Sequence, residues 1–182
     1  ADTTRVFIND RDIFAGGEAV DMDWREGFDF GRVRFRWEAP EAEVTLHIAI
    51  PGDRLKAYVE YVVEPRVPMG SVRVLLRCFP GMYTRSEYRL PAHRWVSTPG
   101  QSVEVRRGKP GKTLAFTQQD GWIFYADRYH DYRYGRGFGP VGLVLGSGDD
   151  ELRGEVRVTD YGLDTHLHCR LDQSRIRFVL YA

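Results

Sequence analysis

The chain has 182 residues, which is long enough to bury a hydrophobic core without a metal or disulfide staple. Its 42 % hydrophobic and 29 % charged residues exclude a disordered protein, and no apolar run approaches the roughly 20 residues that span a bilayer. The net charge of zero excludes an overall field that attracts nucleic acid or an anionic membrane. The chain starts at Ala1 without a targeting segment, as a mature exported protein or a trimmed chain does, and we expect a secreted or periplasmic location.

The first candidate site is an acidic segment near the N-terminus. Asp21, Asp23, Glu26 and Asp29 place four carboxylates within nine residues of a predicted loop. Carboxylate oxygens are the ligands that Ca²⁺ prefers, although the spacing differs from that of an EF-hand loop. The segment predicts a structural calcium site, with a solvated acidic turn as the alternative.

From residue 31 onward, apolar and polar residues alternate in about a dozen short segments, and this period of two predicts β-strands. In the first segment, Val33, Phe35 and Trp37 alternate with arginines. The predicted strands are 31–38, 43–50, 54–63, 71–79, 93–96, 102–106, 112–117, 121–127, 140–145, 154–159, 162–171 and 174–181. No segment has a helical period of 3.6.

Each predicted strand has one apolar and one polar face, which is typical of antiparallel sheets. Two such sheets bury their apolar faces against each other. The sequence therefore predicts an all-β fold, an antiparallel two-sheet β-sandwich of jelly-roll type, as a single domain over residues 1–182. A closed barrel is the structural alternative.

A second candidate site is the segment 83–89, in which Arg85, Glu87 and Arg89 share one face if the chain is extended. Residues 85–89 resemble the Arg-Ser/Thr-Glu-Leu-Arg strand of jelly-roll alginate lyases, whose arginines neutralise a uronate carboxylate. The two other motifs of that family are absent from this sequence. If the chain is such an enzyme, these three residues act with Tyr129 and His130 in catalysis. A ladder of surface salt bridges is the alternative.

The most unusual segment is 122–140, which is rich in aromatic, acidic and basic residues. Its first half is a predicted strand, and the rest is a predicted long loop that ends in glycines. Aromatic rings pack against the C–H faces of a sugar, and Asp, Arg and His form hydrogen bonds with its hydroxyl groups. The predicted sugar-binding residues are Trp122, Tyr125, Asp127, Tyr129, His130, Asp131, Tyr132, Arg133 and Tyr134. The alternative is a loop that its own tyrosines hold against the sandwich.

His166 and His168 lie two residues apart on the polar face of a predicted strand. Two imidazoles in this arrangement can bind Zn²⁺ or Cu²⁺ when a third ligand completes the site. Exposed histidines without a metal are the alternative. The only cysteines, Cys78 and Cys169, both fall on apolar faces, where they are either buried thiols or an inter-sheet disulfide.

These patterns lead to three functional hypotheses. The first is an exported carbohydrate-binding module or accessory domain whose partner is a poly- or oligosaccharide, with no nucleic acid and no membrane span. The second is a small polysaccharide lyase or glycoside hydrolase. The third is a protein-interaction or assembly domain, for which self-association is expected.

Overall fold

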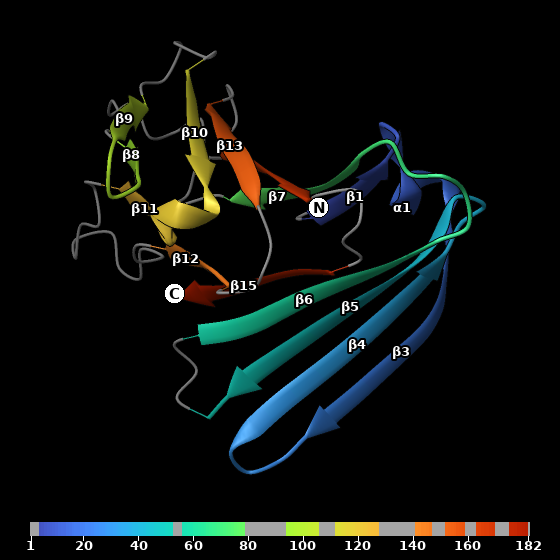
Figure 1. The fold of residues 1–182 in the computed structure, drawn as a ribbon. Helices are drawn as coiled ribbons and strands as arrows, with labels where there is room; N and C mark the ends of the chain where they lie inside the picture. Colours follow the sequence, from blue (N-terminus) through green and yellow to red (C-terminus); the bar gives the residue numbers. More distant parts are fainter. Residues whose placement is uncertain are drawn as a thin grey trace, which may run out of the picture.

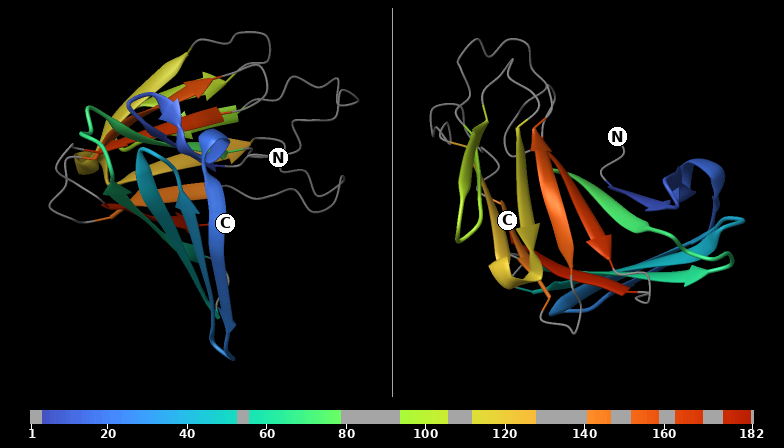
Figure 2. Two further views of the ribbon diagram at one scale, coloured as in Figure 1. Left: turned by 90° about the vertical axis from the view of Figure 1, so that its right-hand side faces the viewer. Right: turned by 45° about the horizontal axis from the view of Figure 1, so that its top comes forward.

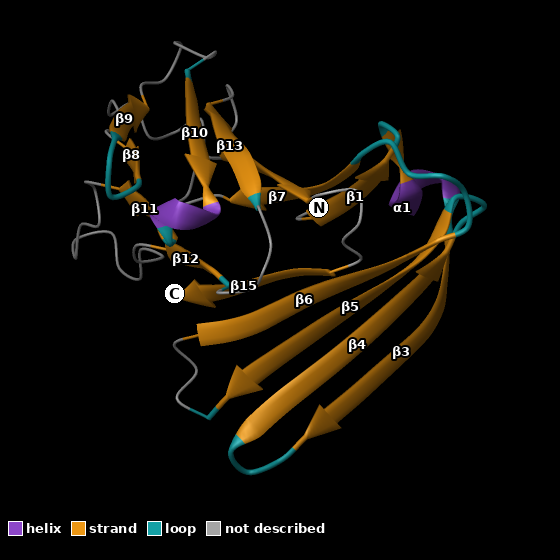
Figure 3. Ribbon diagram, in the orientation of Figure 1, coloured by secondary structure: helices purple, strands orange, loops and turns teal. Residues whose placement is uncertain are grey.

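The computed structural model describes residues 4–52, 56–78, 94–105, 112–127, 141–146, 152–158, 163–169 and 175–181. Most of them lie in β-strands (Figure 3). The elements are β1 (Thr4–Ile8), β2 (Arg11–Asp12), α1 (Ile13–Gly16), β3 (Glu18–Glu26), β4 (Phe30–Glu38), β5 (Ala42–Pro51), β6 (Lys56–Pro65), β7 (Val72–Cys78), β8 (Arg94–Ser97), β9 (Ser102–Val105), β10 (Thr113–Thr117), η1 (Gln118–Asp120), β11 (Trp122–Asp127), β12 (Val141–Leu145), β13 (Arg153–Val158), β14 (Leu163–Cys169) and β15 (Arg175–Tyr181).

The strands form two antiparallel sheets that face each other (Figures 1 and 2). The smaller sheet has six strands in the order β10-β13-β14-β7-β1-β2, and the larger has nine in the order β3-β4-β5-β6-β15-β12-β11-β8-β9. The predicted two-sheet antiparallel sandwich is confirmed, and the described part of the chain holds fifteen strands in place of about twelve. Among the described residues, no helix has the length and apolar character needed to cross a membrane.

The core lies between the sheets because the apolar positions of both face inward. One cluster of buried apolar side chains joins the layers. Its members include Val44, Leu46, Val59, Ile123, Leu143, Ile176 and Phe178 from the larger sheet and Val6, Ile8, Val74, Leu114, Val156, Leu163 and Leu167 from the smaller one. The predicted division of the strand 31–38 is also confirmed, because Arg32 and Arg34 are exposed while Val33 and Phe35 are partly buried.

Two tyrosines of the larger sheet form hydrogen bonds across the core to the smaller sheet. The Tyr61 hydroxyl lies 2.6 Å from Thr4 Oγ1, and the Tyr125 hydroxyl lies 2.6 Å from Thr165 Oγ1. Burial raises the pKa of Tyr61 to about 12, because the charged phenolate would lose its water. Each bond therefore gives the polar end of a buried tyrosine a hydrogen-bond partner.

The connection from β6 to β7 carries the chain from the larger sheet to the smaller one, and Asn9 holds it in place. Asn9 Oδ1 accepts hydrogen bonds from the backbone N–H groups of Gly70 (2.6 Å) and Ser71 (3.2 Å), and Nδ2 donates to the Pro68 carbonyl (3.1 Å). Asn9 has a φ of 49°, in the left-handed region that asparagine tolerates better than most residues. The only asparagine in the chain thus has a clear structural role.

The prediction that residues 21–29 form a loop is wrong, because Asp21, Asp23 and Glu26 lie in the edge strand β3. The segment alternates Met22 and Trp24 with acidic residues, and this pattern identifies a strand. Both side chains are on the face that turns toward the core, opposite Phe35 and Val33 of β4, yet they are 67 % and 53 % exposed. The meander β3–β6 extends past the smaller sheet, which therefore leaves these two side chains uncovered (Figure 2).

The strand register excludes a disulfide between the two cysteines. Cys78 pairs with Leu163 at one end of the β7–β14 ladder, and Cys169 pairs with Val72 at the other end. Six residues of an extended strand separate these positions by about 20 Å. A disulfide requires Cα atoms within about 7 Å of each other.

Candidate functional site

The larger sheet has an outer face that points away from the smaller sheet, and besides Phe30 of β4, four exposed aromatic side chains gather on it. Tyr58, Trp122, Phe124 and Tyr181 are each 40–48 % exposed. We call these four residues the aromatic platform. They come from three strands, β6, β11 and β15, in the part of the sheet where β12 lies between β15 and β11.

The strand register places the platform residues in two neighbouring rows across the sheet. In the first row, Trp122 pairs with Val144, Val144 with Val179, and Val179 with Tyr58. In the second row, Gly142 lies between Phe124 and Tyr181 and pairs with both. Gly142 itself places no side chain between the two rings, and a Cβ added there would make an ordinary contact of 3.5 Å with the Tyr181 Cβ.

A groove of about 830 Å³ adjoins the platform; its charged lining comes from the outer face of the larger sheet, and its apolar lining includes inward-facing residues such as Val33, Ile48 and Phe178. It crosses β3, β4, β5, β6 and β15 and ends beside η1 and Gly146. Tyr58 and Val179 line it and also belong to the first platform row, so the groove and the platform form one continuous surface. The charged side chains and the histidine that line it are Asp23, Arg25, Arg32, Arg34, His47, Glu60, Arg175 and Arg177.

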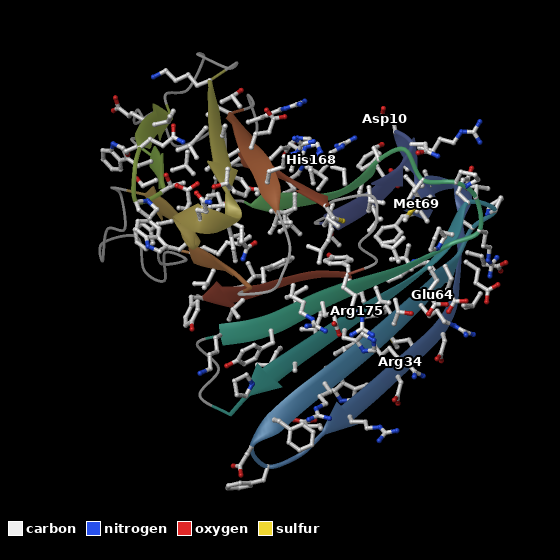
Figure 4. The ribbon with its side chains drawn as sticks, viewed as in Figure 1. Asp10, Arg34, Glu64, Met69, His168 and Arg175 are labelled. Atoms are coloured by element: carbon white, nitrogen blue, oxygen red, sulfur yellow. The ribbon has the colours of Figure 1, made fainter. Side chains whose placement is uncertain are left out.

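These polar side chains form a row of directly paired residues across five strands. Asp23 pairs with Arg34, Arg34 with His47, His47 with Glu60, and Glu60 with Arg177. Figure 4 shows Arg34 and Arg175 over the same part of the meander, although they come from β4 and β15. The row arises because the outward positions of five neighbouring strands carry residues that can form hydrogen bonds.

Glu60 is the acceptor at the centre of the groove. Its Oε1 accepts a hydrogen bond from Arg177 Nε at 2.7 Å and lies 3.8 Å from Arg175 Nη1. At the β3 edge, Arg34 Nη2 donates to Asp21 Oδ2 at 2.8 Å. The Arg32 guanidinium lies 5.1 Å from the centre of the Phe30 ring. These contacts orient the arginines on the surface while the groove remains open to water.

Two of the residues predicted to bind sugar lie on opposite faces of β11. Trp122 is exposed and belongs to the platform, whereas Tyr125 is 0 % exposed and lies in the core, so its ring cannot meet a ligand. The alternation that placed residue 122 outside places residue 125 inside and selects Phe124 as the partner of Trp122. The same alternation places Tyr58 and Glu60 on one outward face, and Tyr181 and Arg177 on another. The sequence-based prediction did not use this pattern.

Several predicted site residues lie outside the described residues, and their roles stay predictions. This holds for Arg85, Glu87 and Arg89 of the lyase-like segment, and for Tyr129, His130, Asp131, Tyr132, Arg133 and Tyr134 of the long loop. The backbone of Asp127 is the last described position of β11.

Two acidic residues of the predicted calcium site have contacts with arginines. Asp21 accepts a hydrogen bond from Arg34, and Asp23 Oδ2 lies 3.3 Å from Arg25 Nε. Asp29 follows β3 in the connection to β4. Within the described ranges, no three His, Cys, Asp or Glu side chains lie close enough together to hold a metal ion. The calcium site stays a prediction.

His166 and His168 share the outer face of the smaller sheet, as the sequence indicates, but His166 is only 7 % exposed. Arg73 Nη1 lies 2.9 Å from His166 Nδ1, and because arginine can only donate, this ring nitrogen accepts. Burial, together with Arg157 and Arg73, lowers the pKa of His166 to about 4. Burial also lowers the pKa of His168. His166 Nδ1 is thus held by Arg73, which leaves the ring proton of the neutral imidazole on Nε2.

The outer face of the larger sheet therefore combines exposed rings with a groove of ordered charged side chains. Such a surface presents apolar faces and hydrogen-bonding groups to an extended ligand that lies across the strands. The first platform row continues through Tyr58 to Ala49, Arg32 and Arg25, so it crosses seven strands, or about 29 Å. No protein-family model matches the chain, and no curated protein has a detectably similar sequence.

Proposed function

We propose that the chain is a carbohydrate-binding β-sandwich whose ligand lies on the outer face of the larger sheet. One observation carries this proposal: four aromatic side chains are exposed together on neighbouring strands of one sheet face. Exposed aromatic residues in one continuous patch indicate a binding surface, because isolated proteins rarely leave such a patch to water. As in the sequence-based hypothesis, the proposed location of the protein is secreted or periplasmic.

A sugar fits this surface better than a purely apolar ligand. The platform supplies flat rings for the C–H faces of the sugar, and the adjoining groove supplies Glu60, Asp23 and arginine donors for its hydroxyl groups. Strand residues position these groups more rigidly than a loop does. The site uses Trp122 from the predicted set and replaces Tyr125 with Phe124, Tyr58 and Tyr181.

The test measures binding to a panel of soluble neutral and acidic polysaccharides by affinity electrophoresis. Trp122→Ala and Tyr181→Ala should each weaken binding about tenfold, because each removes a stacking contact of roughly 1.4 kcal/mol. Phe28→Ala is the matched control, since Phe28 is a fully exposed aromatic residue at the β3–β4 hairpin tip, away from the platform. Absence of binding to every polymer, or equal binding by the platform variants, contradicts the proposal.

A second candidate function is protein association through β3. This strand is the edge of the larger sheet, and its Met22 and Trp24 side chains are more than half exposed. Exposed edge strands with apolar side chains favour pairing with another chain. Light scattering over a range of concentrations tests this: concentration-dependent growth that Trp24→Ser abolishes supports self-association, and a constant monomer mass contradicts it.

A further inference from the structure

We infer that the groove on the outer face selects a polysaccharide that carries carboxylate groups, such as a polyuronate. This inference rests on the proposed function and specifies its substrate class. The observation behind it is independent of the aromatic platform. Five arginines and two carboxylates line the groove, so its formal charge is +3 with His47 neutral, whereas the whole chain has a net charge of zero.

The contacts within the groove leave donors for a ligand. Arg175 and Arg177 both face the same oxygen of Glu60, so one carboxylate serves two guanidinium groups. A guanidinium has five N–H donors, and a carboxylate that binds it in the best geometry occupies two. The side chains of Arg175 and Arg177 remain more than half exposed, so their other donors face water.

The arrangement of the arginines and aromatic rings matches a polymer that carries both charged groups and apolar surfaces along its length. Arg25 and Arg32 occupy the same row of paired residues as Tyr58 and Trp122, and Arg34 and Arg177 occupy the next row. A polymer that crosses the strands meets guanidinium groups over β3, β4 and β15 and aromatic rings over β6 and β11. A polyuronate offers both matching features in one chain, since each sugar ring carries its own carboxylate.

Single-stranded nucleic acid is the other polyanion that uses cations and aromatic rings together. Asp23 and Glu60 among the arginines disfavour it, because each ring of a polyuronate has free hydroxyl groups that donate to carboxylates, whereas an internal deoxynucleotide has none. The same two carboxylates accept hydrogen bonds from sugar hydroxyl groups. The mixture of arginine with carboxylate therefore favours an acidic polysaccharide.

The test compares three probes, sodium alginate, dextran and single-stranded poly(dT), by affinity electrophoresis and titration calorimetry at two salt concentrations. The unmodified protein should bind alginate at least tenfold more tightly than dextran, and this preference should shrink as salt rises. Arg177→Gln and Arg25→Gln should each weaken alginate binding about tenfold without changing the melting temperature by more than a few degrees. The Arg25 side chain is 76 % exposed, so this variant tests the groove even if Arg177→Gln disturbs the sheet.

Arg157→Gln is the matched control, because Arg157 is an exposed arginine that pairs with Glu155 on the other sheet. It should leave alginate binding unchanged. Binding of dextran as tightly as alginate, with no effect of the groove variants, overturns this inference and leaves the proposed function standing. Poly(dT) binding as tight as alginate binding also overturns it. Failure to bind any polysaccharide contradicts both the inference and the proposed function.

Discussion

The outer faces of the two sheets follow the same alternating pattern but expose very different chemistry. On the smaller sheet, Arg77 pairs with Asp164 at 3.1 Å, and Arg73 contacts His166, which is nearly buried. On the larger sheet, the aromatic platform is exposed, and Arg175 and Arg177 share the carboxylate of Glu60 while more than half of each side chain stays exposed. Outward side chains on the two sheets therefore differ in exposure. The side chains on neighbouring strands decide whether an outward residue is packed or stays available for a ligand.

The largest expected effect is a difference in stability between variants on the two faces of β11. Tyr125→Ala should lower the free energy of unfolding by about 3–5 kcal/mol, because it leaves a cavity in the core and removes the partner of Thr165. Trp122→Ala, three residues earlier, should lower it by less than about 1 kcal/mol while it weakens glycan binding about tenfold. Urea unfolding together with affinity electrophoresis measures both. Equal loss of stability in the two variants would contradict the assignment of faces.

The next effect concerns pH and the smaller sheet. His166 has a pKa of about 4 in the folded chain and an ordinary value of 6.5 when unfolded. Between these values only the unfolded chain binds the proton, so the free energy of unfolding should fall as the pH decreases from 6.5 to 4. Arg73 and Arg157 reinforce this direction, whereas Glu155 and Asp164 oppose it.

Chemical unfolding at a series of pH values checks this prediction. His166→Gln should flatten the dependence between pH 6.5 and 4, because glutamine does not titrate and its oxygen can still accept from Arg73. His47→Gln, on the outer face of the larger sheet, is the control for the loss of one histidine. An unchanged slope in His166→Gln would contradict the role of this residue.

The smallest effect belongs to the two tyrosine hydroxyl groups that join the sheets. Tyr61→Phe and Tyr125→Phe should each lower the free energy of unfolding by about 1–2 kcal/mol, because the partly buried Thr4 hydroxyl or the buried Thr165 hydroxyl loses its partner. Thr165→Val in the Tyr125→Phe background should recover part of this loss, since both polar groups are then removed. Thermal unfolding of the single and double variants measures the coupling, and additive losses would contradict a direct bond.

The sequence predicted the fold well because most strands have regular alternation. Twelve of the observed strands correspond to predicted segments, and the core faces of 31–38 and 43–50 are as expected. The strand β3 was missed because its carboxylates suggested a loop, while Met22 and Trp24 carried the opposing signal. The N-terminal strand β1 was also missed. It is short, and its pairing with β7 joins residues that are far apart in the chain.

The site was harder to predict because it depends on register between strands. Tyr58 and Trp122 lie 64 positions apart, and only the pairing of β6, β15, β12 and β11 brings them into one row. Local composition pointed instead to the run of aromatic residues after β11. Within β11 the alternation alone would have selected Trp122 with Phe124 and rejected Tyr125.

The Asn9 contacts have a consequence for the order in which the chain assembles. The strands β3 to β6 are neighbours in both sequence and space, so they form with small losses of loop entropy. The Asn9 bonds to Gly70 close a separation of 61 residues, and the pairing of β7 with β14 closes a longer one. Contacts over such distances slow folding, so the meander is expected to form first and to act as the template on which the smaller sheet later closes.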